Sequence, residues 1–89
     1  MRSLERTTRF KKDHKREKKT DPLLDAALVP VLELLLTDAQ LPERLIDHQL
    51  TGEWKGFRDC HVKPDLVLIY QKPEGLLRLV RLGSHSELF

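Results

Sequence analysis

Cysteine, aromatic residues and long apolar runs are all scarce in this 89-residue sequence. The single cysteine, Cys60, excludes an internal disulfide, so we expect a protein of the reducing cytoplasm. No apolar run approaches the roughly 20 residues that a helix needs to cross a bilayer, which argues against a membrane protein. The first residues, MRSLERTTRF, lack the apolar stretch of a secretory signal. A chain of this length is expected to form one domain over residues 1–89.

Positive charge is concentrated near the N-terminus. Residues 1–20 hold nine Lys and Arg side chains against three acidic ones, whereas the other 69 residues hold seven basic and eleven acidic side chains. The segment therefore carries +6 and the remainder −4, although the whole chain carries only +2. Such a segment attracts nucleic acid phosphates or an acidic protein surface, or it is simply the solvated face of a helix. Composition does not separate these alternatives.

The N-terminal half favours helices. Residues 2–8 permit an edge strand, and helix-forming residues dominate over residues 8–19. Asp21 and Pro22 are typical of a helix start, and the leucine-rich stretch that follows has helical spacing. Pro30 interrupts this stretch because proline removes a backbone hydrogen bond, so we expect a kink or two shorter helices.

The C-terminal half favours strands. Residues 38–52 have the composition of a loop, and the alternating pattern of residues 54–62 predicts a strand with an irregularity at Gly56. Two further strands, LVLIYQ (residues 66–71) and LLRLVRL (residues 76–82), each follow a turn sequence. The order of strand, helix, helix and three-stranded antiparallel meander predicts an α+β fold, with the helices on one face of the sheet.

Antiparallel pairing gathers several ionisable side chains at one end of this meander. The first turn places His61 opposite Val67, and the second turn places Val67 opposite Arg81. Asp65 lies at the same end, and the chain leaves the sheet there carrying His85 with it. Imidazole groups accept and donate protons near neutral pH, and a guanidinium binds phosphate. The set fits metal-free phosphodiester cleavage, in which a ribose 2′-OH attacks the adjacent phosphorus.

Other interpretations of these residues compete with an active site. Each histidine alone is more simply a structural or surface residue, and only the convergence of several favours catalysis. A zinc site built from the same histidines is the competing chemistry, but their spacing matches no common ligand pattern and no cysteine pair is available. We therefore expect no metal and no cofactor. Cys60 is expected to face away from His61, as a small buried residue.

Two segments of the chain resemble the YafQ branch of the RelE-like bacterial toxins. They are residues 47–71, DHQLTGEWKGFRDCHVKPDLVLIYQ, and residues 81–89, RLGSHSELF. The matching motifs are D-H-x-L-x-G, W-K-G-[FY]-R-[DE]-x-H-[VL]-x-P-D and R-x-G-[ST]-H, whereas the N-terminal half agrees only in being basic and helical. The resemblance implies the compact α+β fold of microbial ribonucleases and a type II toxin. Such a toxin is an endoribonuclease that cuts messenger RNA on the translating ribosome and is neutralised by a cognate antitoxin, with DNA contacted only through the antitoxin complex.

The resemblance also implies roles for individual residues. The implied catalytic residues are His48, His61, Asp65 and His85, with His48 or Asp65 as general base and His85 as general acid. The implied substrate contacts are Arg81 near the scissile phosphate and Phe89, with Asp59 in a supporting role, orienting His61 or Arg58. The basic residues expected to approach ribosomal RNA include Lys11, Lys12 and Lys15. Leu66 departs from a tryptophan that some relatives carry after the catalytic carboxylate, which leaves the base preference open.

An alternative from a different class is a non-catalytic RNA- or protein-binding module that keeps the fold and the basic surface. In that case the basic residues of the segment 11–19 carry the function, and the histidines are dispensable.

Overall fold

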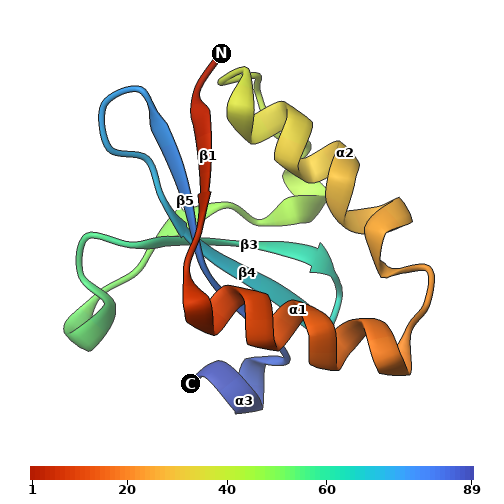
Figure 1. The fold of residues 1–89 in the computed structure, drawn as a ribbon. Coiled ribbons are helices and arrows are strands. Elements are labelled where there is room, and N and C mark those ends of the chain that lie inside the picture. Colours follow the sequence, from red (N-terminus) through yellow and green to blue (C-terminus); the bar gives the residue numbers. More distant parts are fainter.

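Five strands form one sheet in the order β1-β5-β4-β3-β2, and three α-helices pack against it (Figure 1). The structure is a computed structural model that describes residues 1–89 throughout. The strands are β1 (Ser3–Arg6), β2 (His48–Gln49), β3 (Arg58–Lys63), β4 (Leu66–Gln71) and β5 (Leu76–Gly83). The α-helices are α1 (Thr8–Thr20), α2 (Leu24–Leu36) and α3 (His85–Leu88), and two 3-10 turns are η1 (Glu43–Leu45) and η2 (Gly52–Trp54).

The strand arrangement confirms the predicted α+β fold class. β3, β4 and β5 form the expected antiparallel meander, and β2 extends it as an antiparallel strand at one edge. β1 lies at the other edge, where it runs parallel to β5 and matches the edge strand that the N-terminal residues permit. The two shortest strands therefore form the two edges of the sheet.

The main core lies between the sheet and the helices α1 and α2. The residues that make up the predicted apolar stripe of α2 all face this core: Leu24, Leu28, Val31 and Leu35. Cys60 is fully buried among them, as expected, and burial raises the pKa of its thiol to about 12. A thiol with such a pKa is not a nucleophile near neutral pH.

The opposite face of the sheet carries a smaller core. Val67 and Ile69 of β4 are fully buried there, and Leu88 of α3 packs against them. α3 starts at a capping box in which Ser84 and Glu87 exchange hydrogen bonds, which satisfies N–H groups that a helix start leaves without partners. This last helical turn, which the sequence did not predict, is therefore fixed under the sheet (Figure 1).

α2 continues through Pro30, so of the two expected outcomes, a kink or two shorter helices, the division into two helices does not occur. Pro30 is exposed, and its missing N–H deprives only the carbonyl of Ala26 of a helical partner. The buried Leu28 and Val31 on either side hold the helix against the core. α1 matches its predicted range to within one residue. None of the three helices is both long and apolar enough to cross a membrane.

The segment before β3 differs from its prediction. The sequence predicts a loop through residue 52 and a strand from Trp54, but Trp54 belongs to η2 and the strand begins four residues later. Gly52 and Gly56 have positive φ values of 66° and 93°, which residues with a side chain rarely adopt, so the chain turns at both positions. β2 lies inside the predicted loop, and its pairing with β3 brings His48 opposite Asp59.

Candidate active site

Three of the predicted site residues lie on one face of two paired strands. His48 on β2 pairs with Asp59 on β3, and the Nδ1 atom of His48 is 3.0 Å from Oδ1 of Asp59. His61 lies two residues further along β3 and therefore points to the same face, since side chains alternate along a strand. The cross-strand partner of His61 is Val67, which confirms that part of the predicted register. This face is the one that carries the smaller core and α3.

Asp59 is the buried centre of the group, with only 2% of its surface exposed. Burial raises the pKa of its carboxyl group, and the charges of His48, His61 and His85 act against that shift. All three histidines therefore lie within electrostatic reach of one carboxylate. The Oδ1 atom of Asp59 is buried and accepts no hydrogen bond, although Nδ1 of His48 is close to it.

The ring of His48 is oriented by the backbone. Its Nδ1 atom lies 2.9 Å from the carbonyl oxygen of Ile46, and because a carbonyl oxygen only accepts hydrogen bonds, Nδ1 carries the proton. The Nε2 atom of the neutral ring is then left free to accept a proton. Ile46 itself has a left-handed backbone, with φ at 48°, which a β-branched residue rarely adopts. The carbonyl that selects the tautomer thus belongs to a strained residue, a feature common at active sites.

A second network holds the loop that carries His48. Asp47 accepts a hydrogen bond from Nη2 of Arg58 at 2.8 Å and another from the hydroxyl of Tyr70. Tyr70 is fully buried in the main core, as predicted, and burial raises the pKa of its hydroxyl. The residue next to His48 is therefore tied to the centre of the sheet.

His85 and Asp65 meet at the end of the sheet where the register predicts them. The backbone N–H of His85 donates to Oδ1 of Asp65 at 3.4 Å, and both residues are exposed. His85 is the first residue of α3, and its ring centroid is 4.9 Å from that of Phe89. The anchoring of α3 by Leu88 therefore presents the His85 imidazole to solvent beside Asp65.

Arg81 does not lie opposite Val67, so this part of the predicted register is wrong. Val67 pairs with Gly83, and Arg81 pairs with Ile69. The pairing is irregular around Val80 and is displaced by two residues from the prediction. A displacement by an even number of residues leaves side chains on the same face, which is why the error does not remove Arg81 from the site.

Asp13 of α1 holds the guanidinium of Arg81. Nε of Arg81 donates to Oδ2 of Asp13 at 2.7 Å, and Nη2 donates to Oδ1 at 3.3 Å. Asp13 is 3% exposed and also accepts hydrogen bonds from Nη1 of Arg16 and from the backbone N–H of Leu82. Burial alone would raise the pKa of Asp13, but these hydrogen bonds lower it below its usual value. Nη1 of Arg81 makes no such bond and remains available to a phosphate.

Aromatic rings form a chain beside the histidines. The centroid of Phe89 is 6.3 Å from that of Trp54, which in turn lies 5.2 Å from Phe57. Phe89 is 47% exposed, so its ring is accessible for the predicted RNA contact. The sequence predicts a structural anchor for Trp54, and its packing on Phe57 agrees with that role. Its contact with Phe89 also places it next to the His85 ring.

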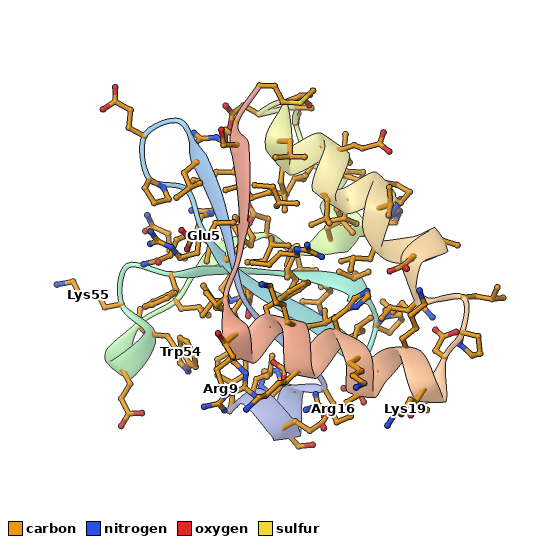
Figure 2. The ribbon with its side chains drawn as sticks, in the orientation of Figure 1. Glu5, Arg9, Arg16, Lys19, Trp54 and Lys55 are labelled. Atoms are coloured by element: carbon orange, nitrogen blue, oxygen red, sulfur yellow. The ribbon has the colours of Figure 1, made fainter.

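The predicted basic residues lie on α1. Lys11, Lys12 and Lys15 are all exposed, while Phe10 of the same helix packs in the main core. Figure 2 shows further basic side chains, among them Arg9 and Lys19, spaced along this helix. α1 also borders the site, because its Asp13 holds Arg81 and its Arg16 lies 3.5 Å from Glu87 of α3.

Sequence reasoning missed two residues that shape the site. In the sequence Asp13 is one acidic residue within a basic segment. It follows Phe10 by three residues, so the two share the buried side of the helix, and this spacing is a signal that the sequence does contain. Ile46 carries no comparable signal, because its left-handed backbone depends on how the loop packs.

Comparison with known proteins finds close relatives over the whole chain. A family model described as the bacterial toxin of type II toxin-antitoxin system, YafQ, matches residues 2–89. The mRNA interferase toxin YafQ of Escherichia coli K12 is 38% identical over 89 residues, which cover 100% of this chain and 97% of that protein. A copper-bound mutant toxin from Helicobacter pylori has a TM-score of 0.95 at 40% identity, with 100% of both chains covered. YafQ in the E. coli DinJ-YafQ complex has a TM-score of 0.89 at 39% identity, covering 100% of this chain and 99% of that one.

Proposed function

This chain belongs to the YafQ family of bacterial type II toxins, and from that premise we propose that it is an endoribonuclease that cuts messenger RNA. The E. coli relative is named as an mRNA interferase. The observation that carries the proposal is the gathering of three histidines around the buried Asp59, on the face of the sheet that carries α3. Phosphodiester cleavage through a ribose 2′-OH needs a proton acceptor, a proton donor and a cation, and these residues supply all three.

In the proposed reaction His48 is the general base. Its Nε2 atom accepts the proton of the 2′-OH, the 2′ oxygen bonds to phosphorus, and the bond from phosphorus to the 5′ oxygen breaks. The nearby carboxylate of Asp59 stabilises the imidazolium that forms on His48. Asp65 is the less suitable base, because it accepts a hydrogen bond from the residue that we assign as the acid.

His85 is the proposed general acid. It is exposed at the start of α3, and it donates a proton to the 5′ oxygen as that oxygen leaves. His61 lies on the same strand face as Asp59, and Arg81 presents Nη1 as a free donor, so both stabilise the charge that develops on the phosphate oxygens. Phe89 packs against the His85 ring, and it either stacks on an RNA base next to the cleaved bond or holds the His85 ring in place.

We derive no step of the reaction through a metal ion. The Helicobacter pylori toxin is described as copper-bound. In this chain no group of three or more His, Cys, Asp or Glu side chains is placed to hold a metal ion. The proposed chemistry requires only proton transfer and fixed positive charge.

We further propose that the message is cut on the translating ribosome and that a cognate antitoxin neutralises the protein. The exposed basic surface of α1 supports an approach to ribosomal RNA, because clustered Lys and Arg side chains bind phosphate without base specificity. The E. coli relative was solved as a complex with DinJ, which supports an antitoxin as partner. DNA is then contacted only through the toxin–antitoxin complex, and the site of action is the cytoplasm.

Cleavage of ribosome-bound message by histidine variants tests the proposal. We expect His48→Ala and His85→Ala each to lower the cleavage rate by about 100- to 10,000-fold, because each removes one proton-transfer group. His14→Ala is the matched control, since His14 pairs with Asp25 between α1 and α2, away from the site, and cleavage by this variant should be retained.

Circular dichroism establishes that the variants are folded. Full cleavage by both folded site variants refutes the catalytic assignment. The non-catalytic alternative requires that result, together with loss of growth arrest in a Lys11→Gln, Lys12→Gln, Lys15→Gln triple variant.

A further inference from the structure

A cavity of about 540 Å³ lies at the end of the sheet away from Asp65 and His85. The loop of residues 49–57 forms one wall, and the adjoining ends of β3 and β4 form the other. Its polar lining residues are Gln49, Thr51, Lys55, Arg58, Gln71 and Lys72. None of the lining residues is acidic, and the volume lies within the usual range of ligand sites. No step of the proposed reaction uses this cavity, which we call the Lys55 cavity.

The Lys55 cavity carries positive charge that neighbouring acids do not cancel. Lys55 makes no ion pair. Lys72 lies 3.2 Å from Asp38, but the same carboxylate oxygen is 2.8 Å from Arg2, so one negative charge is shared between two positive ones. Arg58 is compensated, because it pairs with Asp47. Lys55 is therefore uncompensated at the cavity, and Lys72 is compensated only in part, because it shares the Asp38 carboxylate with Arg2.

The backbone of the loop adds hydrogen-bond donors. The N–H groups of Thr51 and Gly56 take part in no backbone hydrogen bond, although their neighbours in the loop do. A Cβ atom built on Gly52 or Gly56 meets nothing within 4 Å, so the space beside both glycines is open. Unpaired N–H groups beside positive side chains form a site for an anion with several oxygen atoms.

The loop that walls the Lys55 cavity also contacts the active site. Trp54 precedes Lys55, and its ring packs on Phe89, whose ring packs on His85. Figure 2 shows Trp54 turned inward and Lys55 extending outward from the same loop. Arg58 at the cavity precedes His61 at the site by three positions along β3, about 10 Å at the usual rise of a strand, and their side chains point to opposite faces of the sheet. A single-stranded RNA that contacts both must therefore pass around the edge of the sheet, along the loop that carries Trp54 and Lys55.

We propose that the Lys55 cavity binds a backbone phosphate of the single-stranded RNA next to the cleaved bond. This inference rests on the proposed function, because it assigns the cavity to the same RNA substrate. A backbone phosphate carries one negative charge shared by two oxygens, and these oxygens can accept hydrogen bonds from Lys55, from Lys72 and from the unpaired N–H groups. The phosphate contact positions the strand, while the cleaved bond lies at the histidines.

Binding of a short single-stranded RNA with a 2′-O-methyl group on every ribose tests the proposal. This probe cannot be cleaved, because it lacks the attacking hydroxyl. Trp54 is the only tryptophan, so its fluorescence reports binding beside the cavity. The affinity is measured over a series of salt concentrations for wild type, for Lys55→Gln, for Lys72→Gln and for the two substitutions combined. We expect the two substitutions combined to reduce the salt slope of the logarithm of the binding constant by about 0.7, the contribution of one phosphate contact in single strands, and each single variant to reduce it by part of that amount.

Arg6→Gln is the matched control, since it removes the same charge at the opposite edge of the sheet and should leave the slope unchanged. An unchanged slope in Lys55→Gln and Lys72→Gln overturns the cavity assignment, and the proposed function stands if wild type still cleaves ribosome-bound message. The converse outcome is that wild type fails to cleave ribosome-bound message while its RNA binding still shows the lysine-dependent salt slope. That result removes the proposed function and leaves the cavity as an RNA-binding site.

A peptide of glutamates is the second probe. Lysine-dependent binding of this peptide, without lysine-dependent binding of the RNA, overturns the proposal in favour of an acidic protein partner.

Discussion

Two buried aspartates of the site differ in their hydrogen-bond partners and in the direction in which their pKa is shifted. Asp13 is surrounded by donors from Arg16, Arg81 and Leu82, which lower its pKa despite its burial. Asp59 has an oxygen without a hydrogen-bond partner, and burial raises its pKa. The ionised carboxylate of Asp13 therefore stabilises the folded protein, whereas the ionised carboxylate of Asp59 destabilises it.

Replacing each of these two aspartates by asparagine should change the free energy of unfolding in opposite directions at pH 7. We expect Asp13→Asn to lower the free energy of unfolding by about 3 kcal/mol, since it leaves the buried donors of Arg81 without a charged partner. We expect Asp59→Asn to raise it by about 1 kcal/mol, because the change removes an unsatisfied charged acceptor, and to abolish cleavage at the same time. Urea unfolding monitored by circular dichroism measures both effects.

The pH dependence separates these two effects from general packing losses. A folded-state pKa below the unfolded value means that the stability from Asp13 is present above the unfolded pKa and is lost as pH falls through the lowered one. A raised pKa means that the unfolded state loses its proton first, so Asp59 reduces stability as pH rises above the unfolded value of about 3.9. The difference in free energy of unfolding between each variant and wild type should therefore become smaller as the pH falls towards 3. Two variants that shift stability in the same direction at pH 7 contradict this assignment.

The elements differ in how well the sequence predicts them. α1 follows from its run of helix-forming residues, whereas the apolar stripe of α2 and the three-stranded meander follow from hydrophobic periodicity, because their patterns repeat over several turns or alternations. β2 and α3 have two and four residues, too few to show a period, yet they place His48 and His85. The position of Arg81 was wrong because the turn before β5 shifts the pairing by one residue and the irregularity around Val80 shifts it by another, and neither leaves a mark on the hydrophobic pattern.

Pro30 tests how α2 is stabilised. The helix persists through Pro30 because its leucines are buried, so the proline weakens the helix without breaking it. We expect Pro30→Ala to raise the free energy of unfolding by about 1 to 3 kcal/mol, since alanine restores the hydrogen bond to Ala26 and relieves the clash of the ring. Thermal and urea unfolding measure the change. Val29→Ala, at the neighbouring exposed position, should change stability by less than this, and equal stabilisation by both variants argues against the hydrogen-bond explanation.

At the scale of the whole molecule, the two faces of the sheet have separate roles. One face carries the main core with α2, the other carries the histidine group with α3, and α1 contacts both, through Phe10 in the main core and through Asp13 on Arg81. The sequence predicted which end of the meander would hold Asp65, His61 and His85, because turn positions fix that end whatever the exact register. It did not predict the central position of Asp59 or the clamp on Arg81, which arise from contacts between segments far apart in the chain.

The most direct measurement of the central claim is the chemical identity of the ends produced in cleaved message. Wild-type protein acts on ribosome-bound message with and without 1,10-phenanthroline, which binds transition metals and leaves Mg²⁺ for the ribosome. Attack by the 2′-OH with proton transfer by His48 and His85 leaves a 2′,3′-cyclic phosphate on one fragment and a 5′-hydroxyl on the other, in equal amounts under both conditions. Fragments that end in a 3′-hydroxyl and a 5′-phosphate, or cleavage that stops when the chelator is added, would contradict metal-free acid–base catalysis by these residues.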